Sequence, residues 1–421
     1  MTKTRPESTP TSGSCRIQLA GRTVQLAWLR EHTSKAAPLF ARARAEVGHA
    51  WCLCRRPALR LVIRCTRAGR YHLAGWPQEG EQHEATCPFH KLGPGHSGRE
   101  SYSTQAIRET DDGVSIRLAT PLARSLDRPE THEDARDEPP DERNARRTVG
   151  LLGLLHWLWE EAQLNTWQPG FRHRTWHHCH AQLRRHLPDA TVNGQGLDSV
   201  LYLVPPFTPQ AADANTAALD AFRTRLGRHG PTEQRGLLLG QIKEVAPTPY
   251  GVAYRLAHQR TPLYARAALH TRATRSYRHA FSPTAAEHGA RVALFVVERS
   301  PGGHLVAADL AAMLTTRTYI PADSSHEVVM ADALAACRRS FVKPIRYDSA
   351  DAVLPDFVLT DLHPAAYVEV YGIHGRESYE RRKAEKRAFY QRQGARLIEW
   401  DVAQPLPDLI HPERRRPGPN A

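Results

Sequence analysis

The chain has 421 residues, a length that predicts two to three domains rather than one. Its 57 Lys and Arg residues outnumber its 44 Asp and Glu residues, and the net charge of +13 favours a polyanionic partner, although a GC-rich genome also produces an Arg-rich composition. The sequence lacks an apolar run of the roughly 18–20 residues that a membrane helix needs, and its first 14 residues do not have the pattern of a signal peptide. We therefore expect a cytoplasmic protein with no membrane association.

Residues 1–14 are polar and are expected to be disordered, and residues 15–125 are predicted to form an N-terminal module. Strand character occurs over residues 15–26, 59–65 and 71–76, and a helix is expected over residues 34–47. Seven cysteines, an odd number, argue against a disulfide framework and favour metal binding or free thiols.

Four metal-ligand residues recur in this module at short spacings. Cys52 and Cys54 are one residue apart, and His83 and Cys87 are four apart, so each pair can present two ligand atoms to one ion. Three thiolates and one imidazole supply the ligand count of a closed tetrahedral zinc site, which would be structural. Three residues lie close enough in sequence to replace one of the four: His90, His72 and Cys65. The alternative is a chance grouping in a chain with 23 histidines.

Residues 126–147 are highly charged, contain prolines and lack apolar periodicity, which predicts a linker. Residues 148–230 are then predicted to be mainly helical. Helices are expected over residues 148–164, 174–186 and 216–228, with a strand over residues 198–204.

Residues 231–315 are predicted to form a basic, β-rich region with strands over residues 236–245, 251–257, 290–298 and 304–307. Eleven basic residues and only two acidic residues lie between positions 221 and 280, and four tyrosines are interleaved with them. Arginines neutralise phosphates and tyrosines stack on bases, so this pattern predicts nucleic-acid binding by Arg255, Arg266, Arg272 and Arg275. A solvated basic surface over core tyrosines is the alternative.

The last predicted domain covers residues 316–410 and carries three acids in apolar surroundings, before an expected disordered tail at residues 411–421. Glu327 extends the buried stripe of a helix expected over residues 325–341, although a capping box with Ser324 explains that glutamate equally well. Asp356 and Glu369 fall in two short strands, where Val or Ile is usual. The helix that follows places Lys383 and Lys386 on one face.

A helix with one acid, a hairpin with Pro355-Asp356 and Glu369, and a lysine beyond them together resemble the PD-(D/E)XK nuclease superfamily. The resemblance implies that Glu327, Asp356 and Glu369 are catalytic acids. It also implies that Mg²⁺ or Mn²⁺ is held by Asp356, Glu369 and the carbonyl of Val370. Tyr371 occupies the position where the superfamily has lysine, so the lysine has migrated to Lys386 or, as second choice, Lys383.

The whole chain also resembles a bacterial domain-of-unknown-function family found on integrative and conjugative elements. The matching stretches are the Cys52-Leu53-Cys54 start, Leu158-Trp159-Glu160-Glu161-Ala162, Lys343-Pro344-Ile345-Arg346-Tyr347-Asp348 and the hairpin with Asp356 and Glu369. This resemblance implies a mobile-element setting, with protein partners from such an element or from a defence system.

The sequence thus predicts a multidomain α+β protein with an N-terminal zinc-stabilised module and a C-terminal restriction-endonuclease-like α/β core. The leading hypothesis is a metal-dependent endonuclease that hydrolyses DNA phosphodiester bonds, with Arg376 and Arg382 as further DNA contacts. The alternative is a non-catalytic, zinc-containing DNA-binding or assembly protein with a degenerate nuclease fold.

Overall fold

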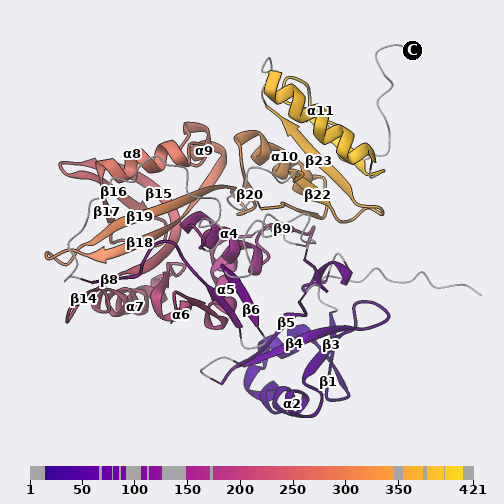
Figure 1. Cartoon of the computed structure of the whole chain (residues 1–421), viewed down its shortest axis with the longest axis horizontal. Coiled ribbons are helices and arrows are strands. Elements are labelled where there is room, and N and C mark those ends of the chain that lie inside the picture. Colours follow the sequence, from indigo (N-terminus) through magenta and orange to yellow (C-terminus); the bar gives the residue numbers. More distant parts are fainter. Residues whose placement is uncertain are drawn as a thin grey trace, which may run out of the picture. The chain divides into compact units, whose positions relative to one another are not determined.

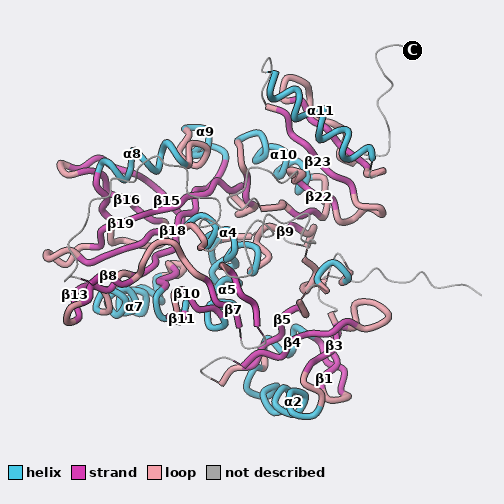
Figure 2. Tube along the Cα trace, viewed as in Figure 1, coloured by secondary structure: helices cyan, strands magenta, loops and turns pink. Residues whose placement is uncertain are grey.

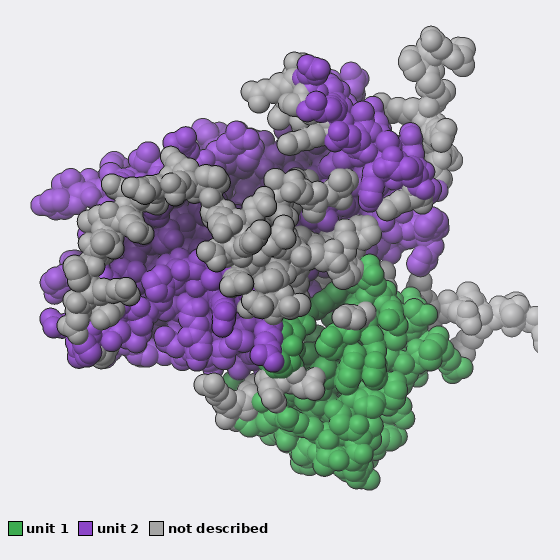
Figure 3. Space-filling model, viewed as in Figure 1, with its two compact units in different colours: residues 1–93, 109–113 green, residues 94–108, 114–421 purple. Residues whose placement is uncertain are grey.

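The computed structural model describes residues 15–65, 69–77, 79–84, 87–91, 106–110, 113–125, 148–170, 174–345, 354–372, 377–392 and 394–410. The predicted tails and the predicted linker at residues 126–147 lie outside these ranges. The chain divides into two compact units, one of Met1–Gly93 with Glu109–Gly113 and one of Pro94–Arg108 with Val114–Ala421 (Figure 3). Both units mix helices with sheets, so the coarse prediction of a multidomain protein of mixed α and β structure is confirmed (Figure 2).

The first unit is built on an antiparallel sheet of strand order β2-β1-β3-β4-β5 (Figure 1). Its elements are β1 (Arg16–Leu19), β2 (Arg22–Gln25), α1 (Leu26–Glu31), α2 (Thr33–Glu46), β3 (His49–Cys52), β4 (Leu59–Cys65) and β5 (Tyr71–Gly75). The segment predicted as one strand over residues 15–26 is a hairpin, because Ala20 and Gly21 turn the chain with φ of 45° and 75°. Phe40 of α2 is buried against this sheet.

The centre of the second unit is a sheet that closes on itself. Its elements are β12 (Leu201–Leu203), β15 (Gly236–Thr248), β16 (Gly251–Leu256), β17 (Leu263–Arg266), β18 (Gly289–Arg299), β19 (Leu305–Thr316) and β20 (Pro321–Ala322). The strand order is β12-β15-β16-β17-β19-β18, and β15 is long enough to pair with both β16 and β18. Strands β15 to β19 therefore form a closed barrel, in which β17 and β19 are parallel.

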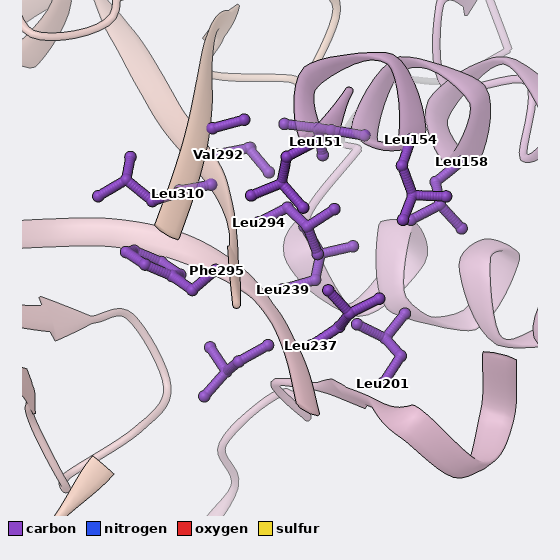
Figure 4. Close-up of a cluster of buried hydrophobic side chains, with 14 of the residues drawn as sticks. Leu151, Leu154, Leu158, Leu201, Leu237, Leu239, Val292, Leu294, Phe295 and Leu310 are labelled. Carbon is purple, nitrogen blue, oxygen red and sulfur yellow. The ribbon is translucent and has the colours of Figure 1, made fainter. Parts of the chain in front are cut away.

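Side chains that alternate along the strands fill the barrel interior on one face and pack against a helix on the other. Leu238 pairs in register with Phe295, whose ring lies 5.4 Å from that of Tyr254 on β16, so this face is the interior. On the opposite face, Leu239 pairs with Leu294 and lies against α4 (Leu151–Glu161) (Figure 4). The helix predicted over residues 148–164 thus uses its apolar stripe to cover the outside of the barrel.

Further helices and two small sheets follow, and all of them except the residues within Glu109–Gly113 belong to this unit. The helices are α5 (Trp176–His186), α6 (Leu197–Val200), α7 (Ala212–Thr224), α8 (Ala267–Ser276) and α9 (Pro283–His288). The small sheets have the orders β11-β10-β7-β6 and β13-β14-β8, with β6 (Ile107–Thr110), β7 (Gly113–Ile116), β8 (Ala123–Ser125), β10 (Ala190–Val192), β11 (Gln195–Gly196), β13 (Gly227–His229) and β14 (Thr232–Gln234). The strand predicted over residues 198–204 is wrong in its first half, which forms α6 before β12 begins.

A five-stranded sheet of order β24-β23-β22-β21-β9 carries the predicted acids. Its elements are β9 (Thr166–Trp167), α10 (Ser325–Ala336), β21 (Phe341–Val342), β22 (Phe357–Leu359), β23 (Ala366–Tyr371), α11 (Glu377–Arg392) and β24 (Arg396–Asp401). Strands β21, β22 and β23 are antiparallel neighbours, and α11 connects β23 to the parallel strand β24. The helix predicted to reach Phe341 ends at Ala336, because Phe341 pairs within this sheet.

In the described parts of the chain, every helix is too short or too polar to cross a membrane.

Leu294→Ala tests the packing of α4 on the barrel. Leu294 is fully buried, so its truncation leaves a cavity, and we expect the free energy of unfolding to fall by about 2–5 kcal/mol. Urea unfolding followed by the fluorescence of the buried tryptophans measures this loss. Val329→Ala, at a side chain that is 41% exposed, is the control and should change stability by less than about 0.5 kcal/mol. An equally small effect of Leu294→Ala would contradict the packing.

Candidate functional site

The three predicted acids come from three elements of the C-terminal sheet. Glu327 lies in the first turn of α10, Asp356 immediately precedes β22, and Glu369 is in β23. The antiparallel register of β22 and β23 brings the last two together. The amide of Asp356 donates to the carbonyl of Val368 over 3.0 Å, and its carboxylate Oδ2 accepts from the amide of Val370 over 2.8 Å. The hairpin itself therefore fixes the Asp356 carboxylate beside β23.

Glu369 is almost completely buried and receives two side chains from α11. Lys386 Nζ lies 2.7 Å from Glu369 Oε2, and the Tyr390 hydroxyl donates to Oε1 over 3.0 Å. These residues are four apart, so one face of α11 provides both. Lys386 Nζ also donates to the carbonyl of Leu354 over 3.1 Å. The structure thus brings together Asp356, Glu369 and Lys386, the lysine that the sequence placed first.

Glu327 takes part in the helix cap and in an ion pair at the same time. Its amide donates to the Ser324 hydroxyl over 3.2 Å, while its Oε2 accepts from the amide of Asp323 over 3.0 Å. The same Oε2 lies 2.7 Å from Lys343 Nζ, which also contacts Asp323 Oδ2 over 2.9 Å. The two explanations weighed from the sequence, a capping glutamate and a site acid, are therefore compatible.

Lys343 is the site residue that sequence reasoning missed. Its side chain is 1% exposed, and its main chain exchanges two hydrogen bonds with Asn165, next to β9. A lysine directly after Phe341-Val342 and before Pro344-Ile345 is unusual for a buried segment, and that apolar context was the signal available in the sequence.

Burial dominates the electrostatics of these acids. It raises the pKa of Glu327 to about 7, and the nearby ammonium group of Lys343 only partly opposes this shift. Burial also raises the pKa of Asp356, with Lys343 and Lys386 lowering it and Glu369 raising it. The proximity of Lys343, Lys386 and Glu369 to Asp356 shows that the two ion pairs belong to one electrostatic site.

Four carboxylates, those of Asp323, Glu327, Asp356 and Glu369, share this site with two lysines. Oxygen ligands of this kind suit Mg²⁺ or Mn²⁺. In the described part of the chain, however, no three of the acids bring ligand atoms within 4.8 Å of one another. The donor set fits a site of one or two carboxylates completed by carbonyl oxygen and water, and a cage of three carboxylates is not formed.

Lys383 lies apart from Glu369. Its Nζ is 3.8 Å from Asp401 Oδ2 and 4.4 Å from the centre of the Tyr371 ring. These side chains line a cavity of about 280 Å³ together with Trp400. Tyr371, at the position where the resemblance predicted lysine, thus belongs to this cavity together with Lys383.

The first unit brings together the four predicted zinc ligands. Cys52 Sγ lies 3.6 Å from Cys87 Sγ, and His83 Nδ1 lies 3.4 Å from Cys54 Sγ and 3.6 Å from Cys87 Sγ. All four ligand atoms lie within 4.8 Å of one another. A tetrahedral ion with Zn–S and Zn–N bonds of about 2.3 and 2.0 Å requires edges of about 3.5–3.8 Å. The cluster can therefore hold a metal ion such as zinc, through the Nδ1 atom of His83.

The alternative ligands considered from the sequence lie elsewhere, and a different cysteine is adjacent. Across β4 and β5, His72 pairs with Arg64 and Cys65 pairs with Tyr71, and His90 Nδ1 contacts the carbonyl of His83 over 3.1 Å. Cys15, by contrast, lies two residues before Ile17, which pairs with Cys52. Hydrogen bonds with Cys15 and, to a smaller extent, with Cys87 lower the pKa of the Cys52 thiol. Cys15 is thus a fifth sulfur beside the cluster.

The predicted phosphate-binding arginines lie on and beside the barrel. Arg255 is in β16, Arg266 ends β17, and Arg272 and Arg275 are on α8, all with exposed side chains. Arg255 lies 3.6 Å from Glu244, and Arg272 lies 2.8 Å from Asp309. Arg376 and the side chain of Arg382 lie outside the described part. Tyr254, one of the interleaved tyrosines, is in the barrel core.

A family model described as "Protein of unknown function (DUF1173)" matches residues 23–403, which is most of the chain. Neither the curated proteins nor the solved structures contain a significant match.

Metal analysis tests the cysteine and histidine cluster. We expect the purified protein to contain about one zinc per chain, measured by inductively coupled plasma mass spectrometry. Cys52→Ser and Cys87→Ser should each lose most of this zinc, because each removes a ligand atom of the cluster. Cys65→Ser is the matched control and should retain zinc. Equal losses from all three variants, or a wild-type protein without metal, would contradict the assignment.

The raised pKa of Glu327 predicts a pH-dependent stability. The folded chain binds this proton more tightly than the unfolded chain, so the free energy of unfolding should fall as pH rises from 4.5 to about 7. A shift of this size corresponds to about 3 kcal/mol. Glu327→Gln should show a much smaller fall, because only the raised pKa of Asp356 remains, whereas Glu287→Gln, at an exposed glutamate, should retain the full fall. Urea unfolding between pH 5 and 8 measures both, and parallel profiles for wild type and Glu327→Gln would refute the assignment.

Proposed function

We propose that this chain, which belongs to the DUF1173 family, is a metal-dependent endonuclease of the PD-(D/E)XK type. It hydrolyses DNA phosphodiester bonds and serves a mobile genetic element or a defence against one. The order of α10, the β22–β23 hairpin and α11 supports this proposal, because the resemblance implies an acid-bearing helix, an acid-bearing hairpin and a helix that backs the sheet.

The observation that carries the proposal is the grouping of Asp356, Glu369 and Lys386. Two buried carboxylates lie side by side, one directly before β22 and one in β23, and a lysine from the following helix reaches Glu369 at 2.7 Å. Burying charged groups is costly unless they are paired, so a fold retains them where they have a use. Two carboxylates that could hold a metal ion, beside an ammonium group, are the groups that metal-assisted phosphodiester hydrolysis uses.

Each side chain has a role that follows from its position. Asp356, Glu369 and the carbonyl of Val370 would hold Mg²⁺ or Mn²⁺, which supplies charge to the scissile phosphate and acidifies a bound water. Lys386 orients the attacking water or stabilises the charge that accumulates on the phosphate, since its ammonium group adjoins the Glu369 carboxylate. Glu327 completes the acidic set from α10, and Lys343 holds it in place.

The zinc site has a different role in this proposal. All four ligands of a tetrahedral ion would come from the protein, namely from Cys52, Cys54, His83 and Cys87. A site without an open position is structural, so zinc would fasten the segment around His83 to β3.

The second candidate is a zinc-containing DNA-binding or assembly protein with an inactive nuclease fold. Two observations favour it. Glu327 and Glu369 are each paired with a lysine, and the described acids do not form a three-carboxylate cluster. In such a protein the ion pairs would serve stability alone.

DNA cleavage separates the two candidates. With Mg²⁺ or Mn²⁺, the wild-type protein should cleave supercoiled, linear or single-stranded DNA, assayed on gels against reactions without added cation. Asp356→Asn, Glu369→Gln and Lys386→Met should each reduce the rate by about 100-fold or more, because the first two remove the charge of a metal ligand and the third removes the ammonium group beside the reacting phosphate. Lys383→Met is the matched control. Lys383 is on the same helix as Lys386 but contacts Asp401 instead of Glu369, so this variant should retain most activity.

Circular dichroism and thermal unfolding establish that each variant is folded. Absence of cleavage of every DNA form by folded wild-type protein would support the second candidate. Cleavage that persists in Asp356→Asn and Glu369→Gln would exclude this site as its source.

A further inference from the structure

The barrel of the second unit has an arrangement that is associated with ligand binding. Its strands β15, β16, β17, β18 and β19 pair in the cyclic order first-second-third-fifth-fourth, and α8 and α9 are inserted between the third and fourth strands. Five-stranded barrels of the oligonucleotide-binding type use the outer face of their second and third strands, with the loops after the first and fourth strands. In this chain that face is the outside of β16 and β17.

The alternation of side chains identifies what this face presents. Tyr254 and Leu263 pair in register and are completely buried, so they point into the barrel. Their neighbours point outward because successive side chains in a strand alternate. The outer face of β16 and β17 therefore carries Arg255, Tyr264 and Arg266, which place one cation on each side of an aromatic ring.

Both bordering loops add a ring to this face. Tyr250, in the loop between β15 and β16, is 92% exposed. The next residue, Gly251, has a φ of +148°, and a Cβ there would lie 2.2 Å from the carbonyl of Ala265, so only glycine permits this bend. At the other end, the loop between β18 and β19 places the His304 ring 5.5 Å from that of Tyr264.

These groups form one strip along β16. Gly251 pairs with Arg266 and Ala253 pairs with Tyr264, so Arg266, Tyr264 and Arg255 follow one another over about 13 Å, with Tyr250 directly before Gly251. Among the described residues, Glu244 is the acid that pairs with the strip, and its contact with Arg255 is a solvent-exposed ion pair at 3.6 Å. Such pairs contribute little, so a phosphate can replace Glu244 at Arg255.

We propose that the outer face of β16 and β17 binds single-stranded nucleic acid. Tyr250 and Tyr264 stack on unpaired bases, and Arg255 and Arg266 contact the phosphates between them. Exposed rings favour a single strand over a duplex, because the bases of a duplex are already stacked on one another. This site goes beyond the proposed nuclease, and its existence does not depend on catalysis at Asp356.

Binding is tested with the full chain carrying Asp356→Asn and without added divalent cation, so that the oligonucleotide stays intact and structural zinc is retained. Fluorescence anisotropy measures the affinity for a labelled oligo-dT strand and for a duplex of equal length. We expect the single strand to bind at least tenfold more tightly than the duplex. Tyr250→Ala and Tyr264→Ala should each weaken single-strand binding about tenfold.

Arginine variants separate this face from general attraction to a basic protein. Arg255→Ala with Arg266→Ala should weaken binding and reduce the dependence of affinity on salt concentration. The control is Arg184→Ala with Arg185→Ala, which removes the same charge from exposed positions on α5 and should leave affinity nearly unchanged.

Four outcomes would overturn the proposal. They are no binding of the single strand, equal affinity for the duplex, unchanged affinity in the tyrosine variants, or an equal loss in the α5 control. Heparin binding that depends on the arginines but not on the tyrosines would assign the face to polyanions in general. Since cleavage is not measured, an inactive nuclease site leaves this test unaffected.

Discussion

The C-terminal sheet depends on the pairing of buried carboxylates with two lysines. Lys386 attaches α11 to β23 through Glu369, and Lys343 attaches the end of β21 to the start of α10 through Glu327. Removing one member of such a pair leaves an uncompensated buried charge, which typically costs 3–5 kcal/mol. Because α11 is highly charged along its length, these polar contacts, together with the buried ring of Tyr390, fix its position on the sheet.

The same pairs leave the site with an unbalanced charge. Asp323, Glu327, Asp356 and Glu369 carry four negative charges when ionised, and Lys343 and Lys386 supply two positive charges. Burial reduces part of this excess by raising the pKa of both Glu327 and Asp356, and at a pKa of about 7 Glu327 keeps its proton in part near neutral pH. A bound divalent cation would instead neutralise the excess negative charge directly. The raised pKa of Glu327 and the proposed binding of a cation would thus have the same physical origin.

Local sequence patterns predicted the residues whose partners are close along the chain or across one hairpin. Asp356 and Glu369 are related by a single turn, and Lys386 follows on the next helix, so strand and helix periodicity sufficed to group them. Lys343 and Cys15 were missed because their partners come from other elements. The Lys343 ammonium group meets α10, and Cys15 reaches Cys52 only through the register of β1 and β3. The individual strands of the barrel were also predictable, but their closure was not, because β15 pairs with β18 across more than forty residues of intervening chain.

Within the second unit, the segment between β17 and β18 connects the barrel to the surroundings of the acidic site. It contains α8 and α9, and α9 packs against α10, the helix that begins beside Glu327. His279, between α8 and α9, lies near the same acids. Burial lowers the pKa of His279, and the carboxylates of Glu327 and Asp323 oppose that shift. Since the insertion begins at Arg266, on the outer face of the barrel, one continuous segment joins a basic residue of that face to the surroundings of Glu327. Within this segment α8 packs on the barrel strands β16, β17 and β19, and α9 packs on α10, so the barrel and the helix that carries Glu327 are supported by neighbouring helices of one connection.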